Sequence, residues 1–360
     1  MRRHILTATA VFALLGIATP SSAYRDYFTP EQKAKLASIQ NVLVRAVALT
    51  DRGKLDPGPI RDLVVDRLER LNYTVVTDPN EPYDVVFRVK CEQYKTWEGT
   101  ARHGGDADLP DSPARLWKGP ACQLTYVLGR MRIDWQKEVR AEFEDPITTA
   151  AAAGAEDPGA YAISHLRDVL AEYDFPLFIA AEWGHGERLL ALLDRPGVPA
   201  SRKLRAISLL GEMQADEALP KLREALKDKR LAKEAAVAIG GLGRDGIPLL
   251  ADLLKHSKDP ELQAAAAKGL GTVGGIAGDP RVVPPLLEML DPPGGIAMNV
   301  QIEVVWALGK MPDKVSIEPL YALHRKVLKR YEPENKQLQE LKEALNWSIK
   351  QTDVTHDVGG

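Results

Sequence analysis

Two glycine-rich stretches have the residue spacing of a nucleotide-binding turn. The segments GLGRDG (241–246) and GLGTVG (269–274) both fit G-x-G-x-x-G, a pattern whose glycines let the backbone approach a pyrophosphate. Such a turn must leave a strand and open a helix. Here both segments follow helix-like sequences, KEAAVAIG and QAAAAKGLG. We therefore interpret these glycines as helix ends and expect no dinucleotide site.

A second group of residues could hold a metal ion. The segment RHGGDADLPD (102–111) lies in a Gly-, Pro- and Asp-rich stretch that we expect to form a loop over 98–119. Its candidate ligands are His103, Asp106, Asp108 and Asp111. A calcium loop needs a ladder of ligands that ends in a bidentate carboxylate, and this ladder is missing. A solvated hairpin loop explains the segment better, so we expect no metal.

Catalytic chemistry has little support in the sequence. The segment EWGHGER (182–188) places His185 near Glu182 and Glu187, but a helix junction would explain its glycines. The chain contains no G-x-S-x-G, H-E-x-x-H, C-x-x-C or Walker A motif. We expect a protein that is not an enzyme and that carries no cofactor.

The first residues resemble an export signal. Arg2 and Arg3 precede an uncharged, mostly apolar stretch of 14 residues, and Ser21-Ser22-Ala23 is a small-x-small cleavage site. We predict a signal peptide over 1–23, cleavage after Ala23 and a periplasmic or secreted bacterial protein. An uncleaved anchor or a buried helix is the alternative. The mature chain contains no apolar run long enough to span a membrane.

The two cysteines, Cys91 and Cys122, favour a disulfide in an exported chain. Cys91 ends one expected strand and Cys122 begins the next. In an antiparallel pair the two residues can lie opposite each other. Two buried free thiols are the alternative.

The first part of the chain, 24–147, predicts a small α/β domain. Hydrophobic alternation and 3.6-residue periodicity mark its elements, with a helix from Thr29 and another from Asp56. The expected strands are 42–49, 73–77, 83–94, 122–135 and 138–144. The last two should form a hairpin that closes near Gln136-Lys137. Because the alternation shifts by one residue after Gly129, we expect a β-bulge there.

The second half of the chain repeats. After a stretch at 148–172 that we assign to a linker and a connecting helix, four segments end alike in an apolar residue and a glycine. These glycines are Gly211, Gly240, Gly271 and Gly309. Each closes the second helix of a helix pair, so we expect a left-handed helix end there. The positions one and five residues before each glycine share a helix face.

These repeats resemble HEAT repeats, in particular the short HEAT-like repeats of phycobilisome lyases. The resemblance implies an all-α solenoid, which we place at 173–350 with a C-terminal cap, and a flexible tail at 351–360. The strand and helix order of the first domain, with RMRIDWQKEVRAEF (130–143), resembles the small α/β domains of bacterial envelope-assembly proteins such as the amino-terminal domain of TolB. The expected fold class is α+β multidomain: a small, sandwich-like α/β domain followed by a HEAT-like solenoid.

In HEAT-like solenoids the second helices usually line the concave face. Five outward positions are our candidate binding residues: Arg205, Glu234, Lys268, Glu303 and Trp306. Their charges are mixed, and the net charge of the chain is −3, so we expect a protein or peptide partner and no nucleic acid. Trp306 either contacts that partner or packs against the cap.

Three functions fit the sequence. The first is a non-catalytic adaptor or scaffold in the cell envelope that binds a protein through its solenoid. The second is a HEAT-like lyase or another enzyme acting in the groove. The third is an envelope protein that binds a small ligand or a metal through the 98–119 loop.

Overall fold

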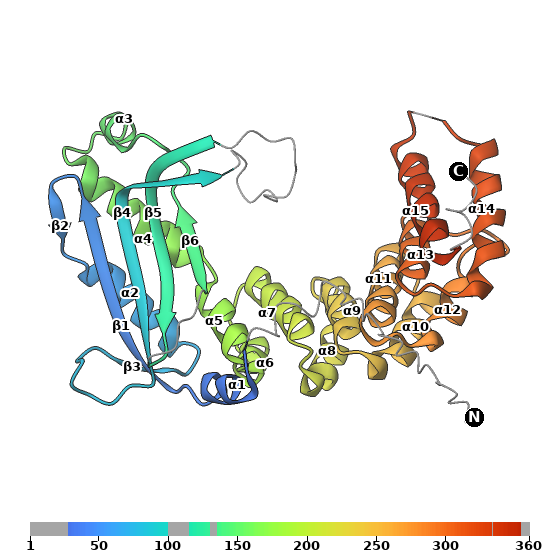
Figure 1. Ribbon diagram of the computed structural model, residues 1–360, viewed down its shortest axis with the longest axis horizontal. Helices are drawn as coiled ribbons and strands as arrows, with labels where there is room; N and C mark the ends of the chain where they lie inside the picture. Colours follow the sequence, from blue (N-terminus) through green and yellow to red (C-terminus); the bar gives the residue numbers. More distant parts are fainter. Residues whose placement is uncertain (1–27, 100–114, 130–134, 333, 354–360) are drawn as a thin grey trace, which may run out of the picture. The chain divides into compact units, whose positions relative to one another are not determined.

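The computed structural model describes residues 28–99, 115–129, 135–332 and 334–353 (Figure 1). The chain divides into two compact units, Gln32–Ala238 and a second that is mainly Ile239–Gly360. The first unit contains a β-sheet, its covering helices and the first repeats, and the second contains the remaining repeats. A small sheet domain followed by a helical repeat region confirms the expected fold class.

The sheet is mixed and has a crossover at its centre. Its strands are β1 (Asn41–Thr50), β2 (Gly53–Leu55), β3 (Thr74–Val76), β4 (Val85–Gly99), β5 (Arg115–Val127) and β6 (Gln136–Arg140). Their order is β2-β1-β4-β5-β6, and β3 also pairs with β1. Because β1 and β4 are parallel, the chain must cross the sheet between them, and α2 (Gly58–Glu69) makes this crossing.

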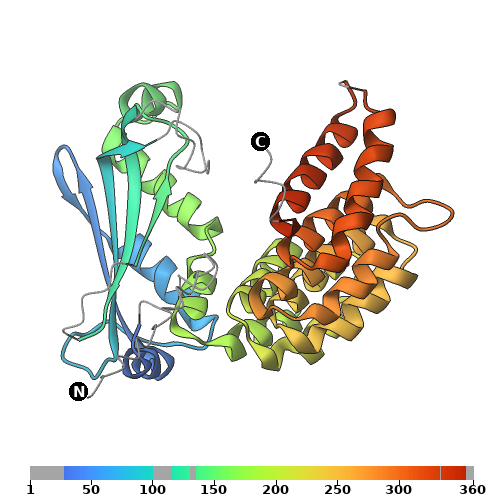
Figure 2. The same cartoon turned by 45° about the vertical axis from the view of Figure 1, so that its right-hand side comes forward.

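Two helices cover the same face of the sheet. α2 and α4 (Pro158–Glu172) lie on one side of the strands (Figure 2). The strands present alternate residues to these helices, including the fully buried Phe87 and Leu124. From the helices, Val64 and Leu166 are equally inaccessible. This two-layer core follows from the alternation of the strands and the 3.6-residue periodicity of the helices.

The hairpin turn predicted near Gln136-Lys137 is wrong, because both residues belong to a strand. β5 ends at Val127, and β6 begins at Gln136, where the turn was expected; Thr125 pairs with Gln136. Gly129, just beyond β5, has φ +56° and lies in a turn; the bulge expected there stays a prediction, because residues 130–134, which carry the shifted alternation, lie outside the described residues. A register irregularity that the sequence analysis did not predict occurs in β4, between Glu92 and Lys95. Residues 98–99 and 115–119 of the expected loop belong to strands.

The stretch expected to be a linker and a connecting helix is helical through most of its length. α3 (Pro146–Ala152) and α4 are each capped by an aspartate, Asp145 and Asp157. α4 contacts four strands and α2, and its Leu166 and Leu170 are fully buried. The Ala-rich composition therefore reflects helices, of which α4 forms part of the sheet domain's core.

The repeats are helix pairs, as predicted. The described helices of this region are α5 (Phe175–Trp183), α6 (Gly186–Asp194), α7 (Ala200–Glu212), α8 (Leu219–Ala225), α9 (Ala232–Gly241), α10 (Ile247–His256), α11 (Pro260–Ala277), α12 (Val283–Glu288), α13 (Met298–Lys310), α14 (Ile317–Lys329) and α15 (Lys336–Thr352). In the second unit, α11, α13 and α15 pack in succession (Figure 1). The predicted inward residues are fully buried, as at Ala266 and Leu270. α15 occupies the place expected for the cap, and its Leu345 is buried.

The repeat glycines do not end helices in a left-handed conformation, as the sequence had suggested. Gly211, Gly240, Gly271 and Gly309 are absent from the residues of positive φ and lie inside helices. Gly211, Gly240 and Gly271 allow close approach of the next second helix, and Gly309 makes room for the side chains of Trp347 and Ser348 on α15. A Cβ atom on Gly211 would lie 2.7 Å from the Ala238 Cα, and one on Gly271 would lie 2.8 Å from the Ala307 Cα. The repeated glycine thus marks a helix–helix contact and not a C-cap.

The same contact explains one glycine of the GLGTVG segment. A Cβ atom on Gly240 would lie 2.5 Å from the Cα of Gly269. Gly269 lies two residues before its repeat glycine, as Ala238 and Ala307 do before theirs. Small residues at both positions therefore bring the backbones of neighbouring helices together.

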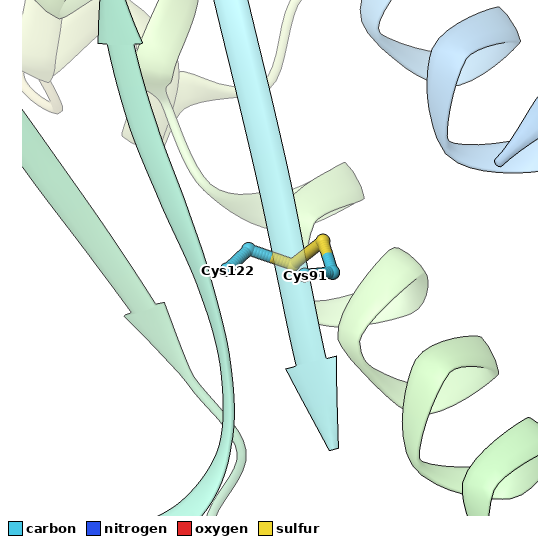
Figure 3. Close-up of a disulfide and its surroundings, with 2 residues drawn as sticks. All are labelled: Cys91 and Cys122. Carbon is cyan, nitrogen blue, oxygen red and sulfur yellow. A yellow bond between two sulfur atoms is a disulfide. The ribbon is translucent and has the colours of Figure 1, made fainter. Parts of the chain in front are cut away.

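The disulfide predicted between the two cysteines is present. Cys91 on β4 and Cys122 on β5 are register partners in the antiparallel pair (Figure 3). Both cysteines are fully buried. The bond ties together the two longest strands of the sheet on the face that the helices cover.

Two glycines of the second unit allow a matched test of helix contact. We expect Gly240→Ala to lower the free energy of unfolding by about 1–3 kcal/mol, because its methyl group would clash with backbone atoms. Gly275→Ala should instead raise it by about 0.5 kcal/mol, because the nearest atom to its Cβ lies at 3.9 Å and alanine favours the helix. Chemical denaturation measures both. Equal effects of the two substitutions would contradict the contact.

Removal of the disulfide should destabilise the sheet domain. We expect the double variant Cys91→Ala/Cys122→Ala to lose about 2–4 kcal/mol of unfolding free energy, because the unfolded chain regains the freedom of a long loop. Denaturation of the oxidised wild type and of the variant, monitored by tryptophan fluorescence, measures the loss. A reduced wild type with the stability of the oxidised form would show that the bond contributes nothing.

Candidate functional site

Three of the five predicted binding residues come together in the second unit. Lys268 lies on α11, and Glu303 and Trp306 lie on α13. Glu303, Trp306 and Lys310 follow one another at three and four residues, so they share a face of α13. Trp347 of α15 completes the group. We call Lys268, Glu303, Trp306, Lys310 and Trp347 the charged-aromatic cluster.

The charges of this cluster are coupled and partly desolvated. Partial burial raises the pKa of Glu303, and the positive charges of Lys268 and Lys310 oppose this shift. Partial burial of its ammonium lowers the pKa of Lys310, although the residue as a whole is exposed, and the charge of Glu303 opposes the shift. Among the described residues, Glu303 forms no ion pair within 4 Å. Its carboxylate therefore interacts with both lysines at longer range and keeps the capacity to accept hydrogen bonds.

Trp306 contacts the cap and is also partly exposed. Its ring centroid lies 5.2 Å from that of Trp347, with the planes tilted by 50°. Trp347 in turn packs over Gly309, where a Cβ atom would lie 2.7 Å from its Cε3. Both tryptophans keep an intermediate exposure. The two roles weighed for Trp306 are therefore compatible: its ring packs on the cap and presents part of its surface to solvent.

The other two predicted residues, Arg205 and Glu234, belong to the first unit. Arg205 is exposed, and its guanidinium lies over the ring of Phe178 with the Cζ atom 5.5 Å from the centroid. Glu234 is partly buried on α9. The predicted surface is thus divided between the two compact units.

The EWGHGER segment forms a helix junction that is fixed by polar contacts. α5 ends at Trp183, and its C-cap Gly184 is left-handed at φ +83°, a conformation that glycine adopts without steric cost. His185 follows at 2% exposure. The hydroxyl of Tyr73 lies 2.8 Å from its Nδ1, and the carbonyl oxygen of Ala37 lies 3.1 Å from its Nε2.

These contacts determine the tautomer of His185. A carbonyl oxygen only accepts, so Nε2 carries the proton and donates it to Ala37, while Nδ1 accepts from Tyr73. Burial lowers the pKa of His185, and the neutral ring satisfies both partners. With both ring nitrogens engaged and no access to solvent, His185 is placed to position the chain and not to exchange protons with a substrate.

Arg188 strengthens the same junction, and the sequence analysis did not identify it. Its Nη1 donates to the Leu71 carbonyl oxygen at 2.7 Å, and its Cζ lies 4.0 Å from the ring centroid of Tyr73. Both Arg188 and Tyr73 are buried. The sequence did contain a signal for this role. Arg188 lies in the first turn of an otherwise apolar helix, and an arginine buried there needs partners outside that helix.

Two surface hollows lie away from the charged-aromatic cluster. One, of about 580 Å³, lies over α2 and is lined by Asp62, Asp66 and Glu69 among others. Another, of about 760 Å³, lies at the ends of α6, α8 and α9, where Lys221 is paired with Asp194 and Glu224. Both are open to solvent, and their charges are of mixed sign.

The described residues contain no group of three or more histidines, cysteines or carboxylates placed to hold a metal ion. The four candidate ligands His103, Asp106, Asp108 and Asp111 lie outside the residues that the structure describes. None of the helices in the described part of the chain has both the length and the apolar character needed to cross a membrane.

The repeats match two families. Residues 228–297 match HEAT repeats, and residues 203–228 and 300–323 match the PBS lyase HEAT-like repeat. Residues 203–323 therefore carry HEAT-like repeats. These segments include all five predicted binding residues. The similarity of the first domain to envelope-assembly domains stays a prediction.

No relative of the whole chain indicates its function. No curated protein matches the chain. An engineered protein solved by the Northeast Structural Genomics Consortium shares 19% sequence identity, with a TM-score of 0.33. The match covers 58% of this chain and 58% of that protein, so the chain spans less than two thirds of its length.

The lowered pKa of His185 predicts a pH dependence of stability. Because the unfolded chain binds a proton near pH 6.5 and the folded chain only at lower pH, the contribution of His185 is present above pH about 6.5 and is lost as the pH falls. We expect the unfolding free energy of His185→Gln to be about 1–3 kcal/mol lower at pH 7 and to fall less steeply between about pH 7 and 5. Denaturation at each pH, with the exposed His256→Gln as the control, measures this. Parallel pH profiles of wild type and His185→Gln would contradict it.

Proposed function

We propose that this protein is an exported, non-catalytic adaptor that binds a protein or peptide of the cell envelope through the second helices of its HEAT-like repeats. The observation that carries the proposal is the charged-aromatic cluster. It combines two cations, one carboxylate and two partly exposed tryptophans on α11, α13 and α15, which pack in succession. HEAT-like repeats support the coarser conclusion of a protein-interaction scaffold.

The chemistry of the cluster favours a polypeptide as its partner. Tryptophans supply apolar contact area and are enriched among the residues that dominate binding energy. The half-buried carboxylate of Glu303 can accept backbone or side-chain N–H groups, while Lys268 and Lys310 can pair with acidic side chains. A phosphate backbone would favour a uniformly basic surface, and the carboxylate works against that.

Two features support export. Arg2 and Arg3, the apolar stretch after them and the Ser21-Ser22-Ala23 site have the composition of a cleaved signal peptide. The buried bond between Cys91 and Cys122 is of the kind that persists in oxidising compartments such as the periplasm. We propose that the mature protein begins at Tyr24 and acts outside the cytoplasm.

A lyase is the second candidate, because residues 203–228 and 300–323 match a lyase-type HEAT-like repeat. That name describes a repeat and not a catalytic residue. The buried His185 has both ring nitrogens engaged in structural contacts. We therefore propose the adaptor function first. Recovery of a covalently modified or pigmented product with the protein would support the lyase function instead.

Substitution of Trp306 tests the adaptor function. The mature protein is purified from the envelope with its partners, which mass spectrometry identifies, and the recovered partner is then titrated against variants. We expect Trp306→Ala and Glu303→Lys to weaken binding at least about tenfold. Leu328→Ala, an exposed apolar residue of α14, should leave binding unchanged.

The melting temperature separates the two roles of Trp306. Because the ring also packs on Trp347, some loss of stability is expected in Trp306→Ala, whereas Glu303→Lys should keep the wild-type melting temperature. Unchanged binding in Glu303→Lys and Trp306→Ala would exclude this surface. Amino-terminal sequencing of the recovered protein tests cleavage after Ala23.

A further inference from the structure

Two arginines are direct neighbours on the face of the sheet that lies opposite α2 and α4. Arg45 on β1 and Arg88 on β4 are register partners in the parallel pair. The residues before them, Val44 and Phe87, are also register partners and are buried on the helix-covered face. Because successive residues of a strand point to opposite faces, both arginines point away from the two helices (Figure 2). We call Arg45 and Arg88 the arginine pair.

The register places the two arginines within reach of a single partner. Neighbouring strands lie about 4.8 Å apart, so the two side chains leave the sheet at almost the same place. Both Arg45 and Arg88 are exposed. Each guanidinium is planar and presents several N–H donors. Anions that approach this face of the sheet can therefore contact both arginines.

The chain itself does not neutralise the arginine pair. Within the described part of the chain, neither the Arg45 nor the Arg88 guanidinium forms an ion pair, a hydrogen bond or a ring contact. The next cation on this face of β4, Lys90, is by contrast paired with Glu92, with the Nζ atom 2.8 Å from Oε1. Like charges at such a spacing repel each other. The arginine pair therefore weakens the association of β1 with β4.

Contact with solvent alone does not explain this arrangement. A sheet often leaves one face to water, and that face then carries polar residues. Threonine would meet this need and would favour the strand without placing two like charges side by side. Residues that are kept at a cost in stability are often those that function requires. The arginine pair is such a feature.

The surroundings of the arginine pair favour a protein over a uniform polyanion. Val47 follows Arg45 by two residues on the same face and is 37% exposed, so it offers apolar contact. Thr125, the register partner of Arg88, is partly exposed and adds a hydroxyl group. Glu92 lies on the same face of β4 and would repel the continuous negative charge of a nucleic acid or a lipid surface. Discrete carboxylates placed over the arginines avoid this repulsion.

We propose that the arginine pair binds an acidic helix of a partner protein. Side chains at i and i+4 of a helix lie about 5–6 Å apart, which matches the spacing of Arg45 and Arg88. Two carboxylates one turn apart can thus each meet one guanidinium through charge-assisted hydrogen bonds. An apolar residue of the same helix contacts Val47. The partner helix covers the second face of the sheet, as α2 and α4 cover the first.

This surface is separate from the one that carries the adaptor function. The arginine pair belongs to the first unit, whereas the charged-aromatic cluster belongs to the second. A protein with both surfaces can hold two partners at once. Because the two surfaces share no residue, each can be removed without changing the other.

An alanine-rich helical peptide serves as the probe for the full-length protein. It carries glutamates one turn apart on one face and is acetylated, amidated and fluorescently labelled. We expect saturable binding that weakens with salt, because the contacts are ionic. The double variant Arg45→Gln/Arg88→Gln should weaken binding at least about tenfold. The matched control is Arg223→Gln/Lys227→Gln, which removes two exposed cations outside the sheet and should change binding less than about twofold.

The melting temperature separates binding from structure. Because the variant Arg45→Gln/Arg88→Gln loses the repulsion between like charges, it should melt at the wild-type temperature or above it. A lower melting temperature would show that the arginines stabilise the sheet and would overturn the argument from repulsion. Charge reversal gives a second readout: Arg45→Glu/Arg88→Glu should lose the glutamate peptide and gain binding of the same peptide with lysines in place of the glutamates.

A rearranged peptide tests the spacing of the carboxylates. The same glutamates placed on opposite faces of the helix should bind at least about tenfold more weakly, and equal binding of the two peptides would exclude a helix that presents paired carboxylates. Trp306→Ala should not affect either peptide, so failure of the adaptor proposal and failure of this one are distinguishable.

Three further results would overturn the proposal. The first is the absence of saturable binding up to millimolar peptide. The second is equal binding by the wild type and Arg45→Gln/Arg88→Gln, which would exclude the arginine pair. The third is tighter binding to vesicles of phosphatidylglycerol than to the peptide, lost in the same double variant, which would assign the pair to a membrane surface instead.

Discussion

Neighbouring second helices of the repeats touch through their backbones, and the rest of the helical region depends on this contact. A glycine on one helix faces a small residue or glycine on the next, as Gly240 faces Gly269 and Gly271 faces Ala307. At such distances no side chain fits between the helices. The spacing of successive helices is therefore determined by main-chain atoms, which leave little freedom for adjustment.

This close approach has consequences for the surface of the second unit. Lys268, Glu303 and Trp347 belong to three different helices, and their charges and rings can interact only because those helices are close. The same proximity removes water from around Glu303 and Lys310, and partial burial shifts the pKa of both groups toward the neutral form. A surface built in this way offers a partner both apolar area and hydrogen-bonding groups that are already partly desolvated.

In the first unit, buried polar contacts hold the first repeats against the sheet domain. His185 and Arg188 at the start of α6 hold Ala37, Leu71 and Tyr73 of the sheet domain. Because these groups are buried, each contact must be satisfied inside the protein. The first repeats are thereby held against the sheet, and this placement brings Arg205 of α7 to the same aromatic ring as Lys137 of β6.

Much of the architecture could be predicted from local patterns. The alternation of Val85, Phe87, Val89 and Cys91 identified a half-buried strand, and the position of Cys91 and Cys122 at facing strand ends predicted the disulfide. The agreement of four segments around a shared glycine predicted the repeats and their inward residues. In each case the pattern follows from the geometry of a single strand or helix, which the sequence determines directly.

Contacts between different helices and strands could not be predicted from such local patterns. A glycine inside a helix and one at its end look alike in sequence, so the close helix contacts of Gly211, Gly240, Gly271 and Gly309 were taken for helix ends. An Ala-rich stretch gave no sign that α4 lies on the sheet. The partners of His185, and the placement of Arg45 beside Arg88, depend on residues far apart in the chain, whose proximity only the packing of the folded protein decides.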